Sequence, residues 1–104
     1  VLICPGAAVS PFPHDQLTVT EIDGEEMPTY MRWLAMTYAL TKALPAACVI
    51  PCGVDAKGMP FGIQIVGPKG SDAKVLEVAH SLEAALAGNA DTARPLPDLA
   101  GLAS

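Results

Sequence analysis

Charged residues are scarce in this 104-residue chain, and positive charge is scarcer still. Only 16% of the residues are charged, against roughly 25% in an average soluble domain. Six Lys and Arg residues stand against eleven Asp and Glu residues, which gives a formal net charge of −5. A nucleic-acid-binding surface needs a basic stripe to neutralise phosphates. We therefore expect no nucleic-acid partner.

Long uninterrupted apolar runs are also missing, although 51% of the residues are hydrophobic. Pro and Gly break every run before it reaches the roughly 18 residues that a membrane span requires. We therefore expect no membrane partner. The apolar fraction is high enough to build a buried core, which excludes a disordered chain.

Cysteine and histidine are too few for a disulfide framework or a metal centre. Cys4, Cys48 and Cys52 are an odd number, and free thiols of this kind favour a cytoplasmic protein. On one extended strand, Cys48 and Cys52 would lie about 13 Å apart, which is too far for a disulfide. His14 and His80 complete no three-ligand set. We expect buried thiols and no metal or cofactor.

Two sequence patterns suggest a catalytic site or an anion-binding site, but neither pattern is specific for that chemistry. Ser10, His14 and Asp15 are neighbours in the sequence, but a nucleophilic triad is usually assembled from distant parts of a chain. A solvated loop histidine is the favoured alternative. Residues 67–71 precede a helix but lack the P-loop spacing, and Pro68 removes an N–H donor. A strand-to-helix turn is favoured there.

Hydrophobic periodicity divides the chain into strands, helices and a long connector. We expect a short buried strand at 1–4, a connector at 7–27 that includes a short strand at 18–20, a helix at 28–43, a two-sided buried strand at 46–50, a paired strand at 61–66, an amphipathic helix from 71 or 72 to 87, and an extended tail at 91–104. The predicted fold class is α/β.

Several of these elements are too apolar for a chain of this length to bury. The first strand begins at residue 1, and the helix at 28–43 is apolar around most of its circumference. A helix of that kind is usually buried on most sides. We therefore expect the chain to be a piece of a longer protein. The predicted partner is the remainder of that protein or a second copy of the chain, with a homo-oligomer as the expected state.

Two further positions attract attention as ligand or core residues. Gln64 lies in an apolar strand, where a buried amide must be hydrogen-bonded. We expect it to tie down a neighbouring loop, with ligand contact as the alternative. Trp33, Tyr30 and Met31 either form part of the core or form the wall of a ligand pocket.

The paired strands carry a specific resemblance. Residues 44–53 read Leu-Pro-Ala-Ala-Cys-Val-Ile-Pro-Cys-Gly, and residues 58–67 read Gly-Met-Pro-Phe-Gly-Ile-Gln-Ile-Val-Gly. With Asp72, Leu76 and Glu83 in the final helix, they resemble the C-terminal segment of the amidase signature family. Residues 1–5 resemble the strand that precedes this segment.

The resemblance implies a fold and an activity. It implies that residues 1–87 are the C-terminal portion of an α/β/α amidase domain, contributing a few strands of a mixed sheet and two main helices, and that 88–104 are a tail. Family members cleave amides with a serine that is activated through a cis-serine and a lysine. This chain has no Gly/Ser-rich region to supply that set. The resemblance implies only candidate substrate-binding residues: Trp33, Tyr30 and Phe12.

We therefore expect a C-terminal fragment of a cofactor-independent carboxamide hydrolase. It would supply core strands and part of the pocket wall, and it would be inactive alone. The alternative is a free-standing, non-catalytic structural or self-associating module derived from that fold. A small unrelated enzyme that uses His14 and Asp15 is a third hypothesis.

Overall fold

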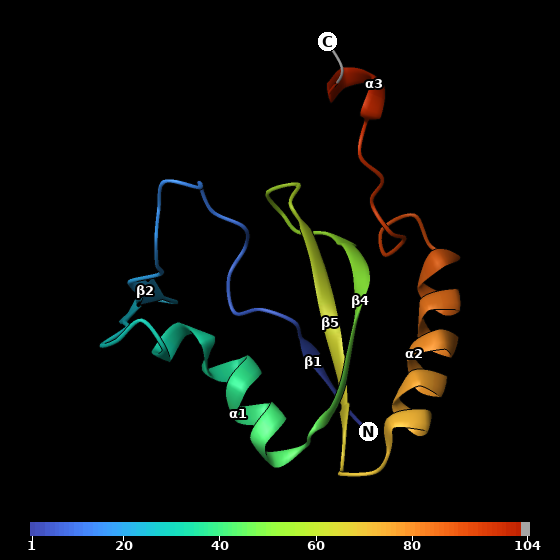
Figure 1. Ribbon diagram of the computed structural model, residues 1–104. Coiled ribbons are helices and arrows are strands. Elements are labelled where there is room, and N and C mark those ends of the chain that lie inside the picture. The colour runs from blue at the N-terminus through green and yellow to red at the C-terminus, as the bar shows by residue number, and fades with distance from the viewer. Residues whose placement is uncertain (103–104) are drawn as a thin grey trace.

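A three-stranded sheet and one long helix form the centre of the protein. The computed structural model describes residues 1–102. In chain order, the elements are β1 (Leu2–Pro5), β2 (Glu21–Ile22), β3 (Glu25–Glu26), the 3₁₀ turn η1 (Arg32–Leu34), α1 (Ala35–Ala43), β4 (Ala46–Val54), β5 (Pro60–Gly67), α2 (Asp72–Ala87) and α3 (Leu99–Leu102). The α/β class and the two main helices are confirmed (Figure 1).

The strand order in the sheet is β1-β5-β4, and it contradicts two expectations about which strands are central or buried. β5 pairs with β1 on one side and with β4 on the other, and both pairings are antiparallel. The predicted pairing of the strands at 46–50 and 61–66 is confirmed, and β4 and β5 form an antiparallel hairpin. The expectation that the 46–50 run is the covered central strand is wrong, because β5 occupies that position. The expectation of a buried first strand is also wrong for this chain, since Leu2 and Ile3 on the edge strand β1 are about half exposed.

The core lies between α2 and one face of the sheet. Its buried members are Ala46 and Ile50 on β4, Ile65 on β5, and Val75 and Ala79 on α2. These positions alternate along the strands and recur at i and i+4 on the helix, as one-sided burial requires. Figure 1 shows α2 along one side of the sheet, with α1 and the connector on the other.

The helix that the sequence placed at 28–43 begins later. Arg32 donates its backbone N–H to Thr29, and Leu34 donates to Met31, which are i→i+3 bonds of a tight 3₁₀ turn. Regular α-helix starts only at Ala35, and every residue of α1 is at least partly exposed. Its apolar circumference therefore has little cover from the rest of the chain.

The connector contains a small hairpin just after the expected strand. Residues 18–20 are irregular, and β2 pairs with β3 instead. Asp23 and Gly24 between them have φ values of 52° and 79°. Two consecutive positive φ angles with an Asp-Gly sequence are typical of a type I′ turn, which matches the twist of paired strands.

The start of the C-terminal tail packs against α2 and β4, and the rest of the tail extends away from the sheet. Thr92 donates its hydroxyl to the carbonyl of Leu86 at 2.7 Å, which caps the end of α2. Asp91 lies against Gly53 of β4. Between 93 and 98 the backbone is irregular, and α3 adds one helical turn that stands away from the sheet (Figure 1). The domain boundary at 87 stays a prediction, and residues 103–104 of the expected tail lie outside the described residues.

Candidate functional site

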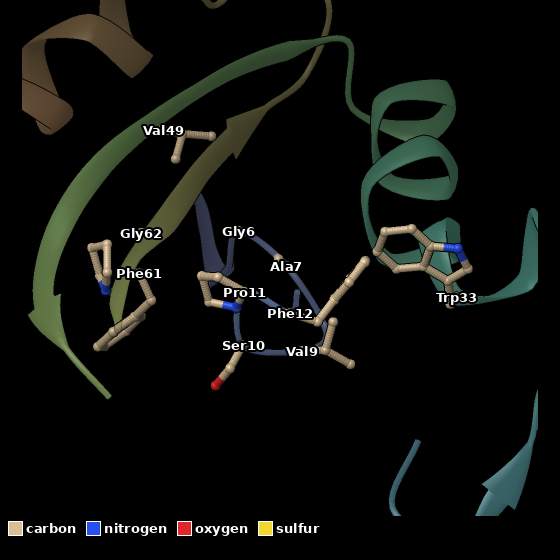
Figure 2. A pocket seen from close by; sticks show the side chains of 11 residues that line it. Gly6, Ala7, Val9, Ser10, Pro11, Phe12, Trp33, Val49, Phe61 and Gly62 are labelled. Carbon is tan, nitrogen blue, oxygen red and sulfur yellow. The ribbon is translucent and has the colours of Figure 1, made fainter. Parts of the chain in front are cut away.

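A pocket of about 400 Å³ lies between the connector and the sheet, on the face opposite α2. Most of its walls are apolar or aromatic. Its lining residues are Gly6, Ala7, Val9, Ser10, Pro11 and Phe12 from the connector, Trp33 from η1, and Val49, Pro60, Phe61 and Gly62 from β4 and β5 (Figure 2).

Glycines allow the connector to lie directly on the sheet. The Gly6 amide donates to the carbonyl of Gly62 at 2.9 Å. A Cβ added at Gly62 would meet Val49 Cγ1 at 2.9 Å and the Ile50 carbonyl oxygen at 3.0 Å. Any larger residue there would therefore push the strands apart and change the floor of the pocket.

The structure brings together the three aromatic residues that the resemblance singled out. The Phe12 and Trp33 rings meet edge to face with centroids 5.8 Å apart, and Tyr30 meets Trp33 at 6.2 Å. Phe12 and Trp33 line the pocket, whereas Tyr30 supports Trp33 from outside and is itself 57% exposed. The Trp33 Nε1 is buried and finds no hydrogen-bond partner within residues 1–102. A role of these rings in substrate binding stays a prediction.

Ser10 and Asp55 tie the connector to the tip of the β4–β5 hairpin. The Ser10 hydroxyl donates to Asp55 Oδ2. The other carboxylate oxygen, Oδ1, accepts the backbone amides of Lys57 and Met59 at 2.8 and 3.0 Å. The hydrogen bond from Ser10, followed by that from Met59, lowers the pKa of the Asp55 carboxyl. This carboxylate therefore holds the rim of the pocket as an acceptor.

That hydrogen bond also argues against a catalytic triad of Ser10, His14 and Asp15. Ser10 is bonded to Asp55, 45 residues away in the sequence, while His14 and Asp15 are solvent-exposed. The structure thus favours the solvated loop histidine. The sequence analysis did not single out Asp55 as a site residue, because no local signal indicates a partner so distant.

Gln64 performs the structural role that the sequence predicted. Its side chain is 3% exposed, and its Nε2 donates to the carbonyl of Pro5 at 3.0 Å. Pro5 is the last residue of β1, directly before the connector. The buried amide therefore fixes the point at which the connector leaves the sheet.

Within residues 1–102 there is no cluster of three His, Cys, Asp or Glu side chains that could hold a metal ion. Cys4, Cys48 and Cys52 are free thiols. Among the described helices, none is long and apolar enough to cross a membrane.

Comparison with known proteins shows a match to one protein family. The family model described as Amidase matches residues 1–76. A Synechocystis sp. protein named "Putative amidase" is 38% identical over 66 residues, which are 64% of this chain and 13% of that relative. Two subunits of glutamyl-tRNA(Gln) amidotransferases are also similar. The Synechococcus sp. protein is 33% identical over 82% of this chain, and the Picosynechococcus sp. protein is 34% identical over 84%.

These relatives are much longer than the chain. The matched regions span 13% to 17% of the three relatives' lengths. No solved structure matches.

Proposed function

The chain belongs to the amidase family, and on that premise we propose that it is the C-terminal part of a carboxamide hydrolase. The observation that supports this most strongly is the family match across residues 1–76, which include β1, β4, β5 and the whole pocket. The C-terminal position rests on the resemblance of the strand pair at 44–53 and 58–67.

In the proposed reaction, a serine outside this chain attacks the amide carbonyl and releases ammonia or an amine. A cis-serine and a lysine accept and return the proton, and water then hydrolyses the acyl-enzyme. Backbone N–H groups stabilise the oxyanion. Two serines of this chain have other roles: Ser10 is bonded to Asp55, and Ser71 donates to the carbonyl of Pro68 at 2.6 Å. The proposed contribution of the chain is therefore to bind and orient the substrate.

The remainder of the enzyme is the proposed partner. Leu2 and Ile3 are about half exposed on the edge strand β1. Exposed apolar strands of this kind are usually covered by protein. The alternative is a structural module that covers the same surfaces with a second copy and forms a homo-oligomer.

We also propose a cytoplasmic location for this hydrolase. Support comes from the three cysteines, which are all free in the structure. Thiols remain reduced in the cytoplasm and tend to pair in oxidising compartments.

A segment-exchange experiment tests the proposed hydrolase. The segment of the Synechocystis relative that matches this chain is replaced by the chain's own residues, and ammonia release is measured over a panel of primary carboxamides. The intact relative is the positive control, and the relative without the segment is the negative control. We expect the exchanged protein to hydrolyse the amides that the intact relative hydrolyses and the 104-residue chain alone to hydrolyse none.

Two results would contradict the proposal. One is ammonia release by the isolated chain. The other is an exchanged protein that folds, as judged by circular dichroism, but releases no ammonia from amides that the intact relative cleaves.

A further inference from the structure

We propose that the pocket between the connector and the sheet binds the uncharged, ring-bearing part of a small carboxamide. This inference rests on the proposed hydrolase function and gives its substrate class. It selects aromatic amides over amino-acid amides and over short aliphatic amides.

The chemistry of the lining excludes charged ligand groups. Within the described chain, the eleven residues around the pocket carry no ionisable side chain. The one side-chain hydroxyl among them, that of Ser10, gives its proton to Asp55. A carboxylate or ammonium group that entered the pocket would lose its hydration without gaining an ionic partner. Zwitterionic amino acids such as glutamine are therefore poor ligands for this pocket.

The aromatic walls favour a ring over an aliphatic chain. Phe12 and Trp33 form one wall, and Phe61, 41% exposed, lies across Pro11 from them (Figure 2). Figure 2 shows the carbon ring of the Trp33 indole turned toward Phe12, with the nitrogen on the far side. An inserted ring can therefore make edge-to-face contacts with carbon-only surfaces.

The size and rigidity of the pocket match a small molecule. Its volume of about 400 Å³ lies within the range of roughly 300–1,000 Å³ typical of small-molecule sites. The Gly6–Gly62 hydrogen bond and the Ser10–Asp55 hydrogen bond fix the connector at two points. Pro11, directly after the second of these points, limits the flexibility of the segment that leads to Phe12. A pocket fixed in advance loses less conformational entropy when it binds a ligand.

Trp33 makes the proposal directly measurable, because it is the only tryptophan in the chain. Its fluorescence is recorded on the folded 104-residue chain during titration with four probes. Phenylacetamide carries a ring and no charge, phenylacetate carries the same ring with a charge, propionamide has no ring, and glutamine is zwitterionic. We expect a saturable change in Trp33 fluorescence with phenylacetamide. The dissociation constants of the other three probes should be at least tenfold larger.

Two variants assign the signal to the pocket. Phe61→Ala removes one ring contact, worth about 1 kcal/mol, and should weaken phenylacetamide binding by about fivefold to tenfold. Leu96→Ala alters a tail residue that is 82% exposed and should leave binding unchanged.

Three results would overturn the inference. Phenylacetate or propionamide could bind as tightly as phenylacetamide, or phenylacetamide could leave Trp33 unaffected. Alternatively, the Trp33 fluorescence could change with the concentration of the chain and not with that of the ligand. That result would show that an apolar side chain of a second copy occupies the pocket. The exchanged enzyme provides a second measurement if the isolated chain does not fold. In that enzyme, kcat/KM for phenylacetamide should exceed that for propionamide by at least tenfold.

The two proposals fail separately. If the pocket binds the ring but the exchanged enzyme releases no ammonia, the proposed hydrolase function is refuted and the pocket assignment stands. Ammonia release with no preference for the ring would refute the pocket assignment and leave the hydrolase.

Discussion

Replacing Gly53 with alanine should destabilise the protein through two separate effects. Gly53 has φ of 74°, a conformation that L-residues adopt at a cost. It is also buried against the tail, and a Cβ at this position would overlap the backbone carbonyl of Asp91. One substitution therefore tests both the backbone conformation of β4 and the docking of the tail.

The structure offers a control that separates the two effects. Gly58 has φ of 77°, and a Cβ added there would find nothing within 4 Å. Gly58→Ala should therefore cost only the backbone strain, about 1–2 kcal/mol. Gly53→Ala should cost that strain and about 1–3 kcal/mol more for the overlap. The sum is a large part of the roughly 5–15 kcal/mol that stabilises a domain.

Urea unfolding followed by far-UV circular dichroism measures both variants, and a shortened chain completes the comparison. In a chain that ends at residue 87, Asp91 is absent, so Gly53→Ala should cost the same as Gly58→Ala. In the full chain, Gly53→Ala should also speed hydrogen exchange at Thr92, whose backbone lies beside the new methyl group. Equal costs for the two variants in the full chain would refute the docking of the tail on Gly53.

Three further substitutions test the core, the pocket rim and the start of the connector. Ile65→Ala, at a fully buried position of the central strand, should lower the free energy of unfolding by about 2–5 kcal/mol in urea; a loss below about 1 kcal/mol would place Ile65 outside the core. Ser10→Ala removes the main cause of the lowered Asp55 pKa. The carboxylate stabilises the fold above its unfolded pKa and loses this effect as pH falls through its folded pKa. Carboxyl NMR should therefore show a higher Asp55 pKa in the variant. As the pH is lowered, the variant should lose the stabilisation from this carboxylate at a higher pH than the unmodified protein does. An unchanged Asp55 pKa would exclude the hydrogen bond. Gln64→Leu removes the donor to the end of β1 and should cost about 1 kcal/mol with faster hydrogen exchange at Gly6, whereas unchanged exchange there would contradict its role.

The parts of the fold that depend on local patterns were predictable. The period of 3.6 in residues 72–87 and the alternation in residues 61–66 identify α2 and β5 almost to their ends. The turn at Asp55 follows from its side chain, which accepts backbone amides two and four residues later. Each of these signals lies within a few residues of the structure that it predicts.

The order of the strands depended on contacts that no local pattern reveals. The apolar run of β4 resembles a central strand, but β1 pairs with β5, some sixty residues later in the chain. That distant pairing moves β4 to an edge. The late start of α1 has a similar cause, since hydrophobicity alone does not distinguish a 3₁₀ turn from the first turn of an α-helix.

The candidate site was predictable only in its aromatic residues. The resemblance indicated Phe12, Trp33 and Tyr30, and the structure brings their rings together. It did not indicate Phe61, which forms the opposite wall, or the Ser10–Asp55 bond at the rim. Both depend on how the connector lies across the sheet.

Ammonia release tests the central claim most directly, measured in parallel for the isolated chain and for the Synechocystis relative that carries the chain in place of its own matching segment. If the chain forms a pocket wall and the reacting serine lies elsewhere, the exchanged enzyme will release ammonia from carboxamides and the isolated chain will release none. Release by the isolated chain, or none from a folded exchanged enzyme whose intact relative is active, would contradict the claim.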